Sequence, residues 1–111
     1  MVDRNDITND AYNILCVIYR VYLQRRRDGL SKTTAIEFSD YELFRQEHLP
    51  KYDKSDFADL IFELKNNELV KLYVDGGFDL TNNAVILMEN RFKNRLSDVI
   101  EFVSKFIGMF L

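Results

Sequence analysis

The sequence predicts a mainly helical α+β domain with one small β-hairpin. Three observations lead to this fold class. Apolar residues recur at helical spacing along most of the chain, one short β-prone run ends at a Gly-rich turn, and the 111 residues include only one Pro and four Gly. Hydrophobic residues make up 47% of the chain, which is enough for a core and too much for a disordered protein. A chain of this length is expected to form a single domain, 1–111.

The first predicted helix spans about residues 10–27. Its apolar residues cover most of the helix surface, which indicates a central, buried helix. Basic residues fill its last turn, where cations complement the helix dipole. The dipeptide Asp28-Gly29 then ends the helix.

Two shorter helices are predicted after a connector. The first spans about residues 41–48 and ends before Pro50, because the residue preceding a proline is disfavoured in a helix. The second follows an N-cap at Asp53 or Ser55 and runs to about residue 67. Its apolar residues recur at steps of three and four, which places them on one face.

A β-hairpin is predicted after these helices. Residues 69–74 are mostly β-prone, the Asp-Gly-Gly sequence at 75–77 is typical of a tight turn, and residues 78–80 form a return strand. A two-stranded ribbon is not stable alone and must pack against helices. A helix-turn-helix followed by a β wing meets this need, so we predict a winged helix-turn-helix core at about 9–82.

A long C-terminal helix is predicted at about 83–110. Its apolar stripe alternates steps of three and four residues, as in a coiled-coil seam. A small domain cannot easily cover both faces of a helix about 42 Å long. We therefore predict a homodimer, or docking onto a partner protein, and the alternative is that the helix folds back over its own core. The predicted interface residues are Phe92, Leu96, Val99, Val103, Phe106 and Phe110.

Several short sequence motifs lie at positions that agree with this predicted order of helices and strands. They are Glu-Leu-Val-Lys-Leu at 68–72, Phe-Asp-Leu-Thr at 78–81, Met-Glu-Asn-Arg-Phe-Lys-Asn at 88–94, Phe-Val-Ser-Lys-Phe-Ile at 102–107 and Gly-Leu-Ser-Lys at 29–32. With these motifs the chain resembles small, mostly uncharacterised winged-helix proteins of Gram-positive bacteria and their mobile elements, of the YjcQ-like type. The resemblance implies the fold, and it implies no settled activity.

The charge distribution argues against the usual DNA-binding mode of a winged helix. The chain has 15 basic and 18 acidic residues, whereas a dedicated nucleic-acid binder usually has a strong basic excess. The helix that would enter the major groove carries Asp53, Asp56, Asp59 and Glu63. These carboxylates would repel the phosphate backbone, so DNA binding would need a local basic patch elsewhere.

Two basic clusters are candidates for such a patch. One lies at the end of the first helix and beyond it, and the other lies in the predicted C-terminal helix. If they converge in space, they form a basic patch away from the third helix. The alternative for each is a solvent-exposed helix face with acidic partners. The candidate nucleic-acid contacts are Arg25, Arg26, Arg27, Lys32, Arg91 and Arg95.

No pattern in the sequence indicates catalysis, a metal or a cofactor. His48 and Cys16 are the only residues of their types, so metal-ligand spacing is absent. Neither a G-x-S-x-G motif nor a phosphate loop is present. We therefore expect no enzyme and no small-molecule substrate. The most apolar segment, 99–111, is too short to span a bilayer, and with no signal peptide visible a cytoplasmic location is expected.

Two functions remain open from the sequence. The first is a DNA-associated or transcriptional regulator that acts as a dimer. The alternative is a protein-interaction module or inhibitor, associated with a phage or mobile element, which uses Asp53, Asp56, Asp59 and Glu63 to imitate the charge of DNA. A continuous basic surface would favour the first, and an unbroken acidic face would favour the second.

Overall fold

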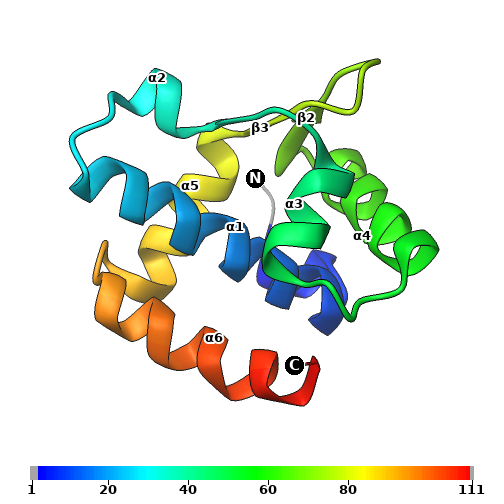
Figure 1. Cartoon of the computed structure of the whole chain (residues 1–111). Coiled ribbons are helices and arrows are strands. Elements are labelled where there is room, and N and C mark those ends of the chain that lie inside the picture. The colour runs from blue at the N-terminus through cyan, green and yellow to red at the C-terminus, as the bar shows by residue number, and fades with distance from the viewer. Residues whose placement is uncertain (1–2, 111) are drawn as a thin grey trace.

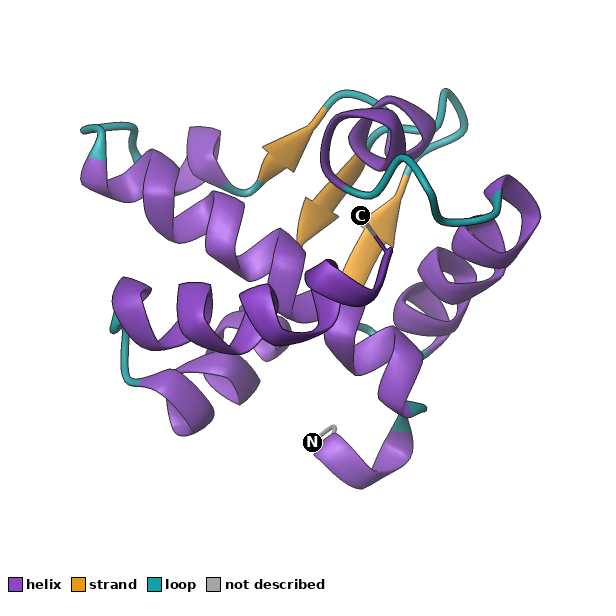
Figure 2. Ribbon diagram, turned by 60° about the horizontal axis from the view of Figure 1, so that its bottom comes forward, coloured by secondary structure: helices purple, strands orange, loops and turns teal. Residues whose placement is uncertain are grey.

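Helices dominate the structure and surround a small antiparallel sheet (Figures 1 and 2). The computed structural model describes residues 3–110, with side chains for 3–106. Helices hold 66% of the chain, which confirms the mainly helical α+β class. The elements are η1 (Arg4–Asp6), α1 (Asn9–Arg27), α2 (Lys32–Ala35), β1 (Glu37–Phe38), α3 (Tyr41–His48), α4 (Lys54–Asn66), β2 (Val70–Leu72), β3 (Phe78–Leu80), α5 (Asn82–Phe92) and α6 (Leu96–Phe110).

Side-chain caps set the beginnings of the main helices. Thr8, Asp40, Asp53 and Thr81 each accept a hydrogen bond from a backbone N–H in the first turn of α1, α3, α4 and α5, respectively. Such a cap satisfies one of the backbone donors that a helix leaves unpaired at its N-terminus. Because this chemistry is local, the predicted positions of α1, α3 and α4 are confirmed to within about two residues.

The sheet has three strands, one more than predicted. Its order is β1-β3-β2, so β3 lies in the middle and pairs with both neighbours in antiparallel fashion (Figure 2). The extra strand, β1, is two residues long and lies in the segment predicted as a connector. Phe38 of β1 stacks on Phe78 of β3 with ring centroids 4.7 Å apart, and this long-range contact holds β1 in place.

The hydrophobic core is centred on α1, which runs through the middle of the molecule (Figure 1). Ile14, Leu15, Ile18 and Tyr19 are each 0% exposed. Helices α2, α4, α5 and α6 all pack against α1, and no residue between Ala11 and Leu23 is exposed. The prediction of a central, buried first helix is confirmed.

The prediction of one continuous helix at 83–110 is wrong. The chain turns between α5 and α6, where Lys93 has φ 51° and Asn94 has φ 62°, both in the left-handed region. Asn94 is held from two sides in this turn. Its side-chain oxygen accepts a hydrogen bond from the Tyr19 hydroxyl at 2.9 Å, and its side-chain nitrogen donates to the Glu89 carboxylate at 3.1 Å. Because left-handed residues cannot continue an α-helix, α6 leaves in a new direction.

The turn folds α6 back over α1, which was the alternative to an exposed seam (Figure 1). The five predicted interface residues whose side chains the structure describes lie in the chain's own core and do not form a free surface. The side chain of Phe110 lies outside the described residues. Homodimer formation remains a prediction. These buried side chains do not provide an exposed interface for it. The five buried residues are Phe92, Leu96, Val99, Val103 and Phe106.

Candidate functional site

A pocket of about 630 Å³ lies where the end of α1, α2 and the α5–α6 turn meet. Four cationic side chains line it: Arg26 and Arg27 from α1, Lys32 from α2, and Arg95 from the turn. We call this the basic pocket. The end of α1, α2 and the α5–α6 turn, which line it, lie at the left of Figure 1, away from α4 and the hairpin at the right. The two predicted basic clusters therefore converge in part.

Local structure explains why these cations meet. Gly29 has φ 96°, which ends α1 and reverses the chain, and the Ser31 side chain then caps α2 directly before Lys32. On the other side, the left-handed residues Lys93 and Asn94 bring Arg95 toward the end of α1. The pocket is thus made of two chain reversals that lie side by side.

Most of the positive charge in the basic pocket has no partner. Arg27 and Lys32 make no ion pair or side-chain hydrogen bond within the described residues. Arg26 donates to the Leu30 carbonyl, and Arg95 approaches the exposed Asp98 carboxylate only to 4.0 Å. One carboxylate, that of Glu89, lines the pocket, and it accepts the hydrogen bond from Asn94. A pocket lined by four cations and one carboxylate favours an anionic ligand, and guanidinium groups suit phosphate oxygens.

Two of the six predicted cations lie elsewhere. Arg25 stacks over the Phe38 ring, with its guanidinium carbon 4.4 Å from the ring centroid, and donates to the Glu37 carbonyl at 2.6 Å. It therefore ties α1 to β1. Arg91 lies over the rings of Phe92 and Phe102, at 5.4 and 5.5 Å from the centroids. Both arginines stabilise the fold, and neither lines the basic pocket.

His48 lies on α3 near the cations of α1, and we expect its protonation to change the free energy of unfolding. Burial, with the nearby guanidinium groups of Arg20 and Arg25, lowers the pKa of His48, while the Glu47 carboxylate opposes this shift. The unfolded chain therefore takes up this proton first as pH falls below about 6.5. The contribution of neutral His48 to the free energy of unfolding is complete above that pH, and it is lost as the pH falls toward the folded-state pKa of His48.

We expect the free energy of unfolding in urea to decrease between about pH 7.5 and pH 5.5. The decrease should be smaller for His48→Gln, which keeps a polar side chain of similar reach and cannot titrate. Equal pH dependence in the two proteins would show that the folded state does not hold His48 neutral.

The four carboxylates of α4 do not form one free acidic face. Asp53 is the N-cap of α4 and accepts a hydrogen bond from the Asp56 N–H. Glu63 accepts two hydrogen bonds from Thr8, one from its N–H at 2.7 Å and one from its hydroxyl at 3.0 Å. Glu63 thus holds the N-terminal end of α1. Only Asp56 and Asp59 remain as exposed carboxylates without such a role.

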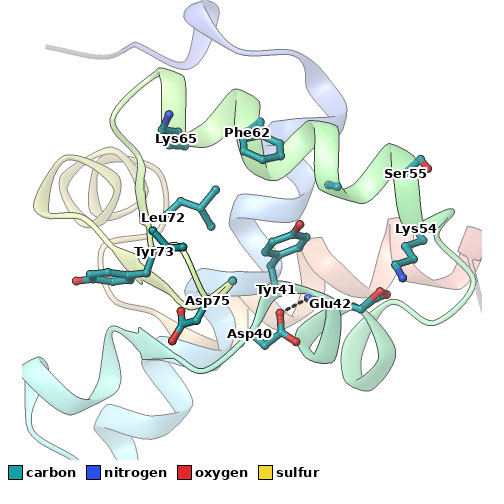
Figure 3. A pocket seen from close by; sticks show the side chains of 13 residues that line it. Asp40, Tyr41, Glu42, Lys54, Ser55, Phe62, Lys65, Leu72, Tyr73 and Asp75 are labelled. Carbon is teal, nitrogen blue, oxygen red and sulfur yellow. Dashed lines mark hydrogen bonds between the residues drawn. The ribbon is translucent and has the colours of Figure 1, made fainter.

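A second depression lies between α4 and the β2–β3 hairpin, and we call it the α4–hairpin groove (Figure 3). Its volume is about 690 Å³. Helix α4 contributes Lys54, Ser55, Ala58, Phe62 and Lys65, which recur at helical spacing and form one face. This face contains none of the four acidic residues. Lys54, Ala58 and Lys65 lie at helical spacing in the sequence, so the signal for this lysine face is local.

Three carboxylates on the other rim of this groove each have a partner within the chain. Asp40 caps α3, Glu42 forms an ion pair with Arg45, and Asp75 accepts a hydrogen bond from the Gly77 N–H. By contrast, Lys54 and Lys65 have no ion pair within residues 3–106. One rim of the groove therefore carries cations without an ion pair among the described residues, and the other rim carries carboxylates that have hydrogen-bond or ion-pair partners within the chain.

Comparison with known proteins adds no relative. No protein-family model matches the chain, and searches of curated proteins and of solved structures found no match. Among the described residues, no group of three or more His, Cys, Asp or Glu side chains is placed to bind a metal ion. No described helix is both long and apolar enough to cross a membrane.

Proposed function

We propose that this chain is a non-enzymatic winged-helix protein that associates with DNA through the basic pocket. The element order supports the fold assignment. A helix and a short strand precede the pair α3 and α4, and the β2–β3 hairpin follows as a wing next to α4 (Figure 1). The likeness to YjcQ-like winged-helix proteins is part of this proposal and rests on sequence motifs alone.

The observation that carries the proposal is the convergence of Arg26, Arg27, Lys32 and Arg95 on one pocket. A chain with a net charge of -3 is repelled by DNA at long range, so a local excess of cations is required for contact. Contacts to phosphate fix position and supply affinity without reading sequence. The basic pocket fits this role of binding the phosphate backbone of DNA. A regulator would use it to increase its affinity for DNA of any sequence.

We expect salt-dependent binding to a mixed-sequence duplex, measured by fluorescence anisotropy between about 50 and 200 mM salt. The double variant Arg27→Glu/Lys32→Glu should bind at least about tenfold more weakly and should lower the salt slope by about two, one for each lost cation. Both side chains are exposed, so the fold should be retained.

The matched control is Lys54→Glu/Lys65→Glu, which changes the net charge equally on the face of α4 beside the hairpin. It should retain most of the DNA affinity of the wild-type protein. If this control instead loses binding and the basic-pocket variant keeps it, DNA docks on α4 in the usual winged-helix manner. Absence of binding by the wild-type protein at low salt would refute the proposal.

A further inference from the structure

The α4–hairpin groove exposes apolar side chains that the fold does not cover. Phe62 is 44% exposed, Tyr73 is 42% exposed and Val74 is fully exposed, and all three line the groove. They are three of the seven large hydrophobic side chains that are exposed in the described part of the chain. Figure 3 shows Phe62 on the α4 side and Leu72 and Tyr41 below it. Exposed apolar side chains that line a depression are typical of a surface that binds a partner.

The free cations lie at the two ends of this apolar surface (Figure 3). Lys54 and Lys65 are eleven positions apart on α4, which corresponds to about 16 Å along the helix axis. An extended peptide advances about 3.3 Å per residue, so about five residues cover this distance. Phe62 lies between the two lysines. The groove therefore offers two positive ends and an apolar centre.

The opposite rim excludes a continuous polyanion. A nucleic-acid strand carries a negative charge at every nucleotide and would meet Asp40 and Asp75 as well as the lysines. A peptide can place carboxylates on one side only, because successive side chains of an extended strand point to opposite sides. Charge complementarity along one rim therefore selects a protein segment over a nucleic acid.

We infer that the α4–hairpin groove is a docking site for an extended acidic segment of a partner protein, with a carboxylate near each end and an apolar side chain between them. The carboxylates pair with Lys54 and Lys65, and the apolar side chain packs on Phe62. The sequence predicts the opposite charge for the partner, because it presents α4 as an acidic surface for a basic partner. The inference does not depend on DNA binding by the basic pocket.

The test is selection of a random seven-residue peptide display library on the immobilised wild-type protein. We expect enrichment of peptides with two carboxylates that flank an apolar residue. A synthetic, fluorescein-labelled copy of the most enriched peptide should bind at least about tenfold more weakly to Phe62→Ala, because such an aromatic side chain is the anchor of a small interface. Lys54→Glu/Lys65→Glu should lose binding of this peptide.

A control separates the groove from general charge effects. Lys93→Glu/Lys105→Glu makes the same charge change at exposed positions outside the groove and should bind the peptide as the wild-type protein does. Phe62→Ala should keep the wild-type urea midpoint, since its side chain is exposed, so lost binding will not reflect unfolding.

Three outcomes would overturn the inference. They are enriched peptides without carboxylates, peptide binding that survives the groove substitutions, and a wild-type dimer in light scattering that Phe62→Asp converts to a monomer. The last outcome would assign the groove to a second copy of the chain. None of these results bears on the salt-dependent DNA binding, so the two proposals fail separately.

Discussion

Replacing Val99 with aspartate is expected to remove most of the stability of this protein. Val99 is 0% exposed and lies in α6, which packs against the central helix α1. An unpaired carboxylate in such a site costs several kcal/mol, which is a large part of the about 5–15 kcal/mol that stabilises a small domain. We expect urea unfolding followed by circular dichroism to lose its cooperative transition, or to show a loss of about 4 kcal/mol or more.

The neighbouring substitution Ile100→Asp provides the control. Ile100 belongs to the same helix and is 41% exposed, so the same aspartate should cost less than about 1 kcal/mol. Equal losses of stability for Val99→Asp and Ile100→Asp would show that Val99 is not buried as the structure places it.

The second large effect is expected at Asn94, in the turn that separates α5 from α6. Asn94→Ala removes the acceptor of the Tyr19 hydroxyl and places a Cβ-bearing residue with no local hydrogen bond at φ 62°. The lost hydrogen bond costs about 1–2 kcal/mol, and the left-handed conformation adds about 1 kcal/mol. We expect a total loss of about 2–3 kcal/mol in the free energy of unfolding.

Asn94→Gly separates the two contributions to this effect. Glycine accepts the left-handed conformation without steric cost but cannot bind Tyr19, so its loss should be about 1 kcal/mol smaller than that of alanine. Equal losses for the two variants would show that backbone conformation does not contribute. A negligible loss for both would show that Asn94 does not hold the turn, and urea unfolding at a single pH is sufficient for the comparison.

Elements with local signals could be predicted from the sequence. The caps at Asp40 and Asp53 lie within one turn of the residues they satisfy, and Pro50 and Gly29 end structure through their own backbone preferences. The Asp-Gly-Gly turn likewise placed the hairpin correctly. The basic residues of the candidate site are also visible in the sequence, although their arrangement in space is not.

The features that were predicted wrongly from the sequence depend on contacts between residues that are distant along the chain. Val85, Met88, Phe92, Leu96 and Val99 keep the spacing of one continuous seam, and their sequence is compatible with an unbroken helix. The break follows from Asn94, which meets Tyr19 across 75 positions of the chain. The only local sign was an asparagine, which tolerates the left-handed conformation better than most residues.

The sequence by itself determined the helical class, the starts of α1, α3, α4 and α5, the hairpin and the identity of the cations. Short-range hydrogen bonds and side-chain periodicity act within a few residues, so a single chain segment contains all the information they need. Only the tertiary structure decided that α6 folds back and that β1 joins the sheet. It also decided that Arg27 and Arg95 line one pocket, while Arg25 and Arg91 lie over aromatic rings. These arrangements depend on which surfaces remain to be buried after the helices have formed, and that is a property of the whole packed chain.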